Sequence, residues 1–236
     1  MEKVRLNKYL SSLGIGSRRE IDSLVKNGKI FVNGEMPEVG IKVDDNDEVI
    51  VNGKKISNKK LEKVYYLLNK PLDVLSSVKD DRGRKTVVEL IETKERIFPI
   101  GRLDYKTTGL LILTNDGDLF NRLIHPRSEI YKKYILETSG FINEEKKYAL
   151  ENGISLDDGM TLPAKVNILM ASQQKSLLEI FIREGRNRQV RRMMEALGNR
   201  VINLKRESLG ELSIGNLKEG EYRKLTEKEI RYLYSL

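Results

Sequence analysis

Asp104 is a candidate catalytic carboxylate. It stands in GRLDYKTTGLL, residues 101–111, with an arginine two positions before it and a tyrosine directly after it. The chain has no cysteine and a single histidine, so the usual pairs of a nucleophile and a histidine base are mostly excluded. Either Asp104 is a turn or helix-cap residue, as aspartates in glycine-flanked loops commonly are, or it acts alone as a nucleophile or base.

A cluster of arginines forms the second candidate. It lies in EGRNRQVRRMMEALG, residues 184–198, where the spacing of the apolar residues predicts a helix over 188–197. The arginines are Arg186, Arg188, Arg191 and Arg192. They can form a solvated helix face or a cradle for phosphate groups, and one guanidinium can instead pair with a carboxylate from elsewhere in the chain.

Three further residues could in principle bind a metal ion, but a structural role explains each of them better. Asp116 and Asp118, in TNDGDL, fit an Asn-Asp-Gly turn followed by a residue near a helix start. His125 has no second histidine with which to share a metal ion. The sequence also lacks a glycine-rich phosphate loop of the nucleotide-binding type, so we expect neither a metal nor a cofactor.

The charge balance favours a polyanionic partner. Lys and Arg number 43 against 35 Asp and Glu, a net charge of +8. Nucleic acid is favoured over a membrane because no segment approaches the roughly 18 consecutive apolar residues of a membrane span. The N-terminus lacks the apolar core of a signal peptide, and without cysteine there is no disulfide framework. We therefore expect a soluble, cytoplasmic protein that binds nucleic acid.

Residues 1–56 are expected to form two helices and a twisted hairpin. Apolar spacing in VRLNKYLSSLG predicts the first helix, and Ser17 with Glu20 forms the capping-box pattern that begins the second. KIFVNG and EVIVNGKKI predict strands with tight Asn-Gly turns. Basic residues gather on the helices, where free backbone N–H groups at a helix start can also bind phosphate. They include Arg5, Lys8, Arg18, Arg19 and Lys26.

A polar linker, residues 57–63, is expected before a second domain over residues 64–236. VYYLLNKP predicts a strand that ends at Pro71. Further strands are predicted over 97–100, 110–113, 131–137, 166–170 and 177–182, and helices over 118–124, 144–152, 188–197 and 227–234. The predicted fold class is therefore α+β, with a mixed, largely antiparallel sheet.

Residues 1–56 resemble a known RNA-binding domain. RLNKYLSSLGIGSRREIDSLVKNGKIFVNG is similar to the small domain named after ribosomal protein S-four, in which a helix pair and the following turn grip structured RNA. The resemblance implies that the basic residues of this segment contact RNA, through its shape and phosphates more than through its bases.

The whole chain resembles the pseudouridine synthases that modify ribosomal RNA. NKPLDVLSS, FPIGRLDYKTTGLLILTNDG, KKYILET and EGRNRQVRRM occur in the order and approximate spacing of that family. The similarity is greatest to the branch with an N-terminal S-four-type domain, and within it to enzymes of large-subunit RNA. It implies that Asp104 is catalytic, in an isomerisation of uridine that needs no metal, cofactor or cosubstrate.

The resemblance also implies roles for residues around Asp104. Arg102 matches the arginine that enters the RNA stack as the target nucleotide leaves it, and Tyr134 matches the tyrosine that lies against the target base. Arg191 matches the basic residue that pairs with the catalytic carboxylate. Asp104 needs such a partner, because burial alone would neutralise it whereas a guanidinium favours the anion.

Further positions of these motifs are expected to support the site. Lys70 and Pro71 belong to the motif that supports the active-site loop, and we expect Arg186 and Arg188 to bind RNA. The family usually has glycine where this chain has Asp73, at a turn that we expect to need an unusual backbone angle. Aspartate tolerates the left-handed region better than most residues, so we expect some strain in this loop rather than a loss of activity.

The expected substrate is one uridine, or a small group, in large-subunit ribosomal RNA, either free or in an assembling particle. A monomer suffices for this, since two basic domains around one RNA require no second subunit. One alternative is a small-subunit RNA synthase of the same branch. The other is a non-catalytic RNA-binding assembly factor, which explains the charge but not the joint presence of Asp104, Tyr134 and Arg191.

Overall fold

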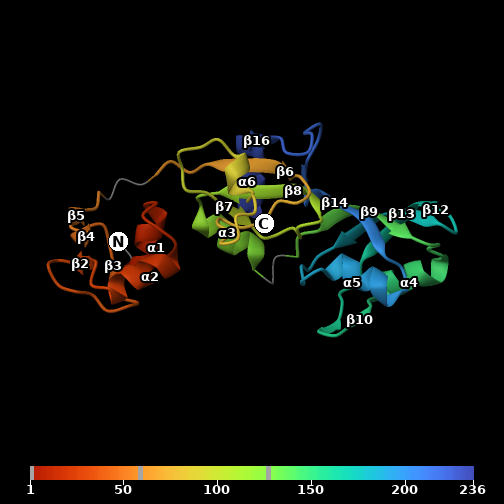
Figure 1. Ribbon diagram of the computed structural model, residues 1–236, viewed down its shortest axis with the longest axis horizontal. Helices are drawn as coiled ribbons and strands as arrows, with labels where there is room; N and C mark the ends of the chain where they lie inside the picture. Colours follow the sequence, from red (N-terminus) through yellow and green to blue (C-terminus); the bar gives the residue numbers. More distant parts are fainter. Residues whose placement is uncertain (1–2, 58–60, 126–128) are drawn as a thin grey trace. The chain divides into compact units, whose positions relative to one another are not determined.

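The computed structural model describes residues 3–57, 61–125 and 129–236 (Figure 1). The chain forms two compact units. The first runs to Val64 and takes in residues 94–96 and 115–117, and the second holds the remainder. The boundaries expected from the sequence, 1–56 and 64–236, stay a prediction. Residues 58–60 of the expected linker lie outside the described residues.

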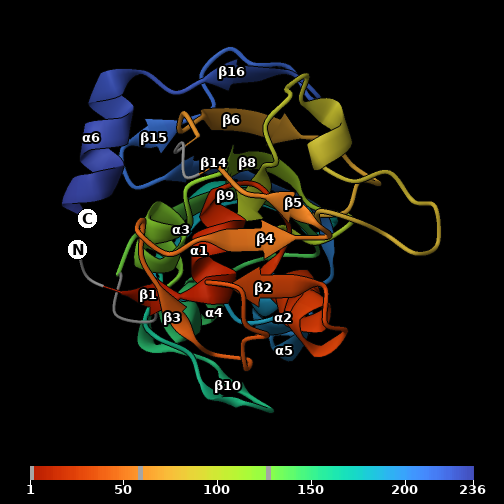
Figure 2. The same cartoon turned by 90° about the vertical axis from the view of Figure 1, so that its left-hand side faces the viewer.

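The first unit packs two helices on short strands. The helices are α1 (Leu6–Ser12) and α2 (Arg18–Lys26). Figure 2 shows β2 (Ile30–Val32), β4 (Val49–Val51) and β5 (Lys54–Lys55) as one antiparallel sheet, and β1 (Val4–Arg5) pairs with β3 (Lys42–Val43). Leu10, Ile21 and Ile30 are fully buried in a common core. The predicted helix pair and hairpin are confirmed, whereas the pairing of β1 with β3 was not predicted.

Local signals in this unit act as the sequence predicts. The Ser17 hydroxyl accepts a hydrogen bond from the Glu20 N–H, and the Glu20 carboxylate accepts one from the Ser17 N–H, which completes the capping box of α2. Asn33 and Gly34 both have positive φ, 52° and 84°, and so do Asn52 and Gly53. Two consecutive residues with positive φ are typical of the type I′ turns that match the twist of a hairpin.

A nine-stranded sheet runs through the second unit (Figure 1). Its order is β12-β13-β9-β14-β8-β6-β16, with β15 paired to β14 and β7 paired to β8. The strands are β6 (Tyr65–Lys70), β7 (Phe98–Ile100), β8 (Thr108–Thr114), β9 (Lys132–Ser139), β12 (Lys165–Ala171), β13 (Lys175–Ile182), β14 (Val201–Leu209), β15 (Leu212–Ser213) and β16 (Tyr222–Lys224). Over the described residues its strand pairs are antiparallel except β8 with β14, so the predicted α+β class and largely antiparallel sheet are confirmed.

The central strand β14 is absent from the sequence-based prediction. Its sequence, VINLKRESL, carries adjacent charges and shows no alternation of apolar and polar residues. It becomes a strand because it pairs with β9 along most of its length and with β8 at Lys205 and Arg206. Tertiary pairing therefore overrides a weak local signal.

The helices of the second unit agree with the prediction to within a residue or two. They are α3 (Gly117–Ile124), α4 (Glu144–Asn152), α5 (Gln189–Ala196) and α6 (Glu227–Ser235). A short 3₁₀ helix (Val88–Leu90) and a separate hairpin of β10 (Ser155–Leu156) and β11 (Gly159–Met160) complete the unit. Arg188 is not part of α5, because as its N-cap it adopts a left-handed φ of 48°.

Strand β8 anchors the loop that contains Asp104. All its residues are buried, and Leu110 and Ile112 share a core with Leu119 of α3 and Leu233 of α6. Figure 1 shows α3 and α6 beside β6, β7 and β8, while α4 and α5 lie beside β9, β13 and β14. The apolar LLILT segment is thus a buried strand, as predicted, and it fixes the C-terminal end of the loop.

Candidate active site

The loop between Leu103 and Thr107 is held by its backbone. Each carbonyl along it accepts a hydrogen bond, from a different group. The donors are Ser76 Oγ to Leu103 O (2.9 Å), Thr107 N to Asp104 O (3.0 Å), Asp73 N to Tyr105 O (3.0 Å), Arg191 Nη2 to Lys106 O (2.7 Å) and Lys70 Nζ to Thr107 O (3.0 Å). Because these bonds leave the side chain of Asp104 out, the loop keeps its shape without using the carboxylate.

The Asp104 carboxylate is left available to a ligand. Its residue is half-buried, and among the residues that the structure describes the carboxylate has no hydrogen-bond or ion-pair partner. Burial lowers the pKa of two nearby cations, Lys70 and Arg191, and both lie close enough for the charge of Asp104 to oppose that effect. A carboxylate without a local partner, within electrostatic range of buried positive charge, suits a nucleophile or base better than a helix cap.

Arg191 comes from α5 and is 8% exposed. Burial lowers its pKa and the charge of Arg188 lowers it further, whereas Asp104 acts in the opposite direction. The guanidinium is bonded to Lys106 O, and the structure records no direct ion pair between it and Asp104 over the described chain. Its Nε is buried and has no hydrogen-bond partner among the described residues. The structure therefore brings Arg191 to the Asp104 loop, and a direct pairing of the two charges stays a prediction.

Lys70, the last residue of β6, supports the Asp104 loop. It is fully buried, and its Nζ donates to Pro71 O at 2.9 Å as well as to Thr107 O. Burial lowers its pKa to about 8, and the charges of Asp73 and Asp104 oppose that effect. The predicted supporting role of this motif therefore has a direct physical basis in two backbone hydrogen bonds.

Asp73 occupies the left-handed conformation, with a φ of 59°, as the sequence led us to expect. Its N–H donates to Tyr105 O, and its carboxylate forms an ion pair of 2.6 Å with Lys106. Asp73 thus contacts the Asp104 loop twice, through its backbone and through its side chain, where glycine would have only the backbone contact.

Tyr134 lies on β9, 8% exposed, directly opposite Arg206 of β14. Arg206 in turn pairs with Gly109 of β8, five residues after Asp104. A Cβ at Gly109 would overlap the backbone of Arg206, so only glycine permits this close approach of β8 and β14. Tyr134 is thereby separated from β8, the strand that follows the Asp104 loop, by β14 alone, with Arg206 between the two strands. Arg206 itself was not predicted, because the prediction did not include β14.

Two segments of the chain match known protein families. The RNA pseudouridylate synthase family matches residues 54–196, and the S4 domain matches residues 4–49. The chain belongs to the RNA pseudouridylate synthase family. The resemblance seen in the sequence is therefore confirmed, and so is the prediction that the protein is an enzyme of this class.

Relatives of this synthase align with nearly all of it. It is 46% identical over 236 residues to ribosomal large subunit pseudouridine synthase B of Bacillus subtilis (strain 168), covering 98% of this chain and 96% of the relative. It is 36% identical over 234 residues to the dual-specificity RNA pseudouridine synthase RluF of Escherichia coli (strain K12), covering 99% and 79%. A crystal structure of a pseudouridylate synthase superimposes with a TM-score of 0.71 at 31% identity, covering 98% of this chain and 99% of the other.

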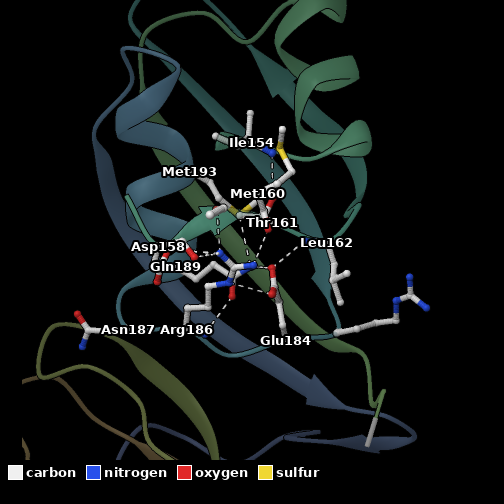
Figure 3. Close-up of polar contacts among 12 residues, drawn as sticks. Ile154, Asp158, Met160, Thr161, Leu162, Glu184, Arg186, Asn187, Gln189 and Met193 are labelled. Carbon is white, nitrogen blue, oxygen red and sulfur yellow. Dashed lines mark hydrogen bonds and ion pairs between the residues drawn. The ribbon is translucent and has the colours of Figure 1, made fainter. Parts of the chain in front are cut away.

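Arg186 of the synthase is engaged within the protein (Figure 3). Its Nε donates to Glu184 at 3.0 Å, and its terminal nitrogens donate to the β10–β11 hairpin at Asp158, Gly159 and Met160. Binding of RNA by Arg186 stays a prediction, but one that these contacts do not favour. Arg188 is half-exposed and reaches Glu195 at 3.5 Å, a contact that an RNA phosphate could replace.

Other predicted RNA contacts lie at the surface of their own units. Arg102 is exposed on the loop before Asp104. In the first unit the side chains of Arg5, Arg18, Arg19 and Lys26 are exposed, and Lys8 is half-buried. Their exposure is compatible with phosphate binding, and their contacts with RNA stay predictions.

The remaining acidic candidates show structural contacts. Asp116 is buried and forms an ion pair of 3.0 Å with Lys63, and Asp118 lies in the first turn of α3. Within the described ranges, no group of three or more His, Cys, Asp or Glu side chains is arranged to hold a metal ion. No helix among the described residues is long and apolar enough to cross a membrane.

Proposed function

We propose that this enzyme isomerises a uridine of large-subunit ribosomal RNA to pseudouridine, with Asp104 as its catalytic carboxylate. One observation carries the assignment of Asp104: its carboxylate has no partner among the described residues, on a loop whose own carbonyls are all hydrogen-bonded. The similarity to the Bacillus subtilis large-subunit enzyme over almost the full length of both chains supports the choice of RNA.

The reaction makes modest demands on side chains. The bond between uracil N1 and ribose C1′ breaks, C1′ is joined to C5 of the same base, the proton on C5 leaves and N1 gains one. Asp104 either attacks C1′ or removes a proton from the ribose, and both routes need the anion. The positive charges of Lys70 and Arg191 attract that anion in a partly desolvated site.

The target uridine must leave its stack to reach Asp104. Extrusion costs a few kcal/mol, which contacts with the extruded base and the surrounding RNA offset. Tyr134 supplies an aromatic face on an interior strand of the sheet, and the exposed side chain of Arg102 can fill the space that the uridine leaves. These roles follow the family resemblance and belong to the proposal.

The test uses unmodified ribosomal RNAs of both subunits and maps pseudouridine after incubation with the enzyme. We expect new pseudouridine at one site, or a small group of sites, in large-subunit RNA. Asp104→Asn should lower the rate by at least about a thousandfold, the range of acid–base or nucleophilic catalysis, while RNA binding is retained. Product only in small-subunit RNA would redirect the proposal to that substrate, and binding without turnover by wild type would support an assembly factor.

A second candidate is action on more than one class of RNA. It is favoured by the similarity to RluF, which is named as a dual-specificity enzyme. Transcriptome-wide mapping of pseudouridine in cells with and without the protein separates the two cases. Loss of sites from ribosomal RNA alone would exclude the second candidate.

We also propose that the two domains have separate roles. Residues 1–56 would bind RNA, and residues 64–236 would carry out the reaction. A cytoplasmic monomer suffices for both, and light scattering of the enzyme with and without RNA measures this directly. A dimer as the active species would contradict it.

A further inference from the structure

Arg206 is a buried cation that the mechanism above does not use. It is only 5% exposed, and its Nε donates to Leu110 O at 2.8 Å. Its two terminal nitrogens have no hydrogen-bond or ion-pair partner among the residues that the structure describes. An arginine keeps its charge at all ordinary pH values and offers five N–H donors, so most of its hydrogen-bonding capacity is left unused.

Arg206 and Tyr134 lie on the same face of the sheet. It stands opposite Tyr134 of β9, and residues opposite one another in paired strands project from the same face of the sheet. Its other neighbour, Gly109, has no side chain to cover it. The low exposure of Arg206 does not set it apart, since Tyr134 and Arg191 are each only 8% exposed.

Lys132 is a second cation at the same place. It precedes Tyr134 by two residues on β9 and therefore shares its face. Its Nζ donates to two neutral carbonyls, Arg183 O at 3.2 Å and Ile130 O at 3.4 Å. Burial, and secondarily the nearby charge of Arg206, lower the pKa of Lys132 to about 8, while the charge of Glu184 acts in the opposite direction.

This pair differs from other basic side chains of the same unit. Arg192 pairs with Asp158 at 2.9 Å, and Arg223 pairs with Glu229 at 2.6 Å. Neither Arg206 nor Lys132 has a carboxylate within ion-pair distance in the described part of the chain. Two adjacent, partly desolvated cations repel one another, and an anion placed between them would relieve that repulsion.

We infer that Arg206 and Lys132 form a binding site for one phosphate group of the RNA, adjacent to the extruded uridine that Tyr134 contacts. The inference rests on the proposed action on RNA and adds a specific anchor to it. An extruded nucleotide keeps a phosphate on each side, and charged hydrogen bonds to phosphate fix position without reading sequence. Held there, the backbone would place the target ribose over the Asp104 loop.

A purely structural role for Arg206 is the competing explanation. The pairing of β8 with β14 ends at Gly109. At the next residue of β8, the hydrogen bond from Arg206 Nε to Leu110 O takes the place of a backbone hydrogen bond between the strands. Substitution of Arg206 can therefore disturb folding. Among the described residues Lys132, at the start of β9, donates only to the carbonyls of Ile130 and Arg183, so Lys132→Met is the cleaner variant. Arg206→Lys serves as a second variant, whose folding is checked by thermal unfolding.

The test uses an RNA fragment that the wild-type enzyme binds, made with a single neutral methylphosphonate linkage at each position around the target uridine. For wild type, one linkage should weaken binding and raise KM by about tenfold, the effect of losing one charge-assisted contact. Lys132→Met should show the same loss on unmodified RNA and no further loss at that linkage, with kcat nearly unchanged. Lys205→Met is the matched control. Lys205 directly precedes Arg206 on β14 and therefore projects from the opposite face of the sheet.

Two results would overturn the phosphate site. One is equal sensitivity of wild type and Lys132→Met to every linkage, and the other is a fall in kcat without a change in KM, which indicates a structural effect on Tyr134. Because binding is measured as well as turnover, failure of the proposed reaction is recognised separately, as binding without pseudouridine.

Discussion

At the scale of single residues, Arg191 acts on Asp104 through the backbone as well as through its charge. Its Nη2 bonds to Lys106 O. The guanidinium therefore braces the loop and keeps one buried donor, Nε, without a partner among the described residues. A lysine in its place would keep the charge and lose the planar fork.

Arg191→Met is expected to lower kcat by at least about a hundredfold, the loss typical for one fixed electrostatic contact in an active site. KM should change much less, since the contact is made to the catalytic loop rather than to distant RNA. Kinetics on unmodified RNA measure this, with Arg191→Lys expected to retain part of the activity. Full activity of Arg191→Met would reject its role.

Asp73→Gly tests the cost of an aspartate in the left-handed region. Relief of the positive φ favours the variant by about 1 kcal/mol. Loss of the exposed ion pair with Lys106 opposes this by up to about 1 kcal/mol, and the greater freedom of glycine in the unfolded chain opposes it further. Urea denaturation should therefore show a change in the free energy of unfolding within about 1 kcal/mol, with activity retained. A severalfold loss of activity would show that the ion pair shapes the loop.

At the scale of elements, the N-terminal end of α5 is tied to the β10–β11 hairpin. Asp158 of that hairpin accepts hydrogen bonds from Arg186 and Arg192, and Gln189 bonds to Glu184 (Figure 3). Since α5 also carries Arg191, this network fixes the helix from which the Asp104 loop is braced. The hydrogen bonds of Arg192, and secondarily those of Arg186, hold the pKa of Asp158 down to about 2.

The network predicts a dependence of stability on pH. The pKa of Asp158 in the folded protein is about 2 against an ordinary 3.8, so its contribution is present above about pH 4 and is lost as pH falls towards 2. We expect Asp158→Asn to be less stable than wild type near neutral pH, with the difference shrinking below about pH 4. Urea unfolding at several pH values measures it, and a difference independent of pH would contradict the assignment.

At the scale of the whole molecule, the net charge of +8 is spread over both units of the chain. The exposed arginines at the start of α2 are suited to phosphate contacts. Such contacts add affinity and salt dependence, and they carry little sequence information.

Binding of RNA should therefore weaken steeply with salt, and the first unit should account for part of the slope. Changing Arg18 and Arg19 together to alanine is expected to reduce the slope of log K against log salt by about 1 to 2 units. The kcat at saturating RNA should stay unchanged. Arg231→Ala, an exposed arginine of α6 in the other unit, is the control. An unaltered slope in the double variant would argue against RNA binding by this helix.

The sequence by itself determined the features that depend on near neighbours. The capping box at Ser17 and Glu20 and the positive φ of Asn33 follow from interactions that span only a few residues. The order of the motifs was equally informative about the family, because the segments around Asp104 and Arg191 can be recognised in the sequence without knowledge of the fold. Family membership and fold class could therefore be predicted before any coordinates.

Only the tertiary structure decided which distant groups share the site. Strand β14 has no local signal, and its pairing with β8 and β9 brings Arg206 to Tyr134 and Gly109. The sequence also could not show that Arg186 is engaged by the β10–β11 hairpin rather than free for RNA. The physical reason is the same in both cases: strand register and long-range hydrogen bonds depend on partners far along the chain, and local patterns leave many such pairings equally open.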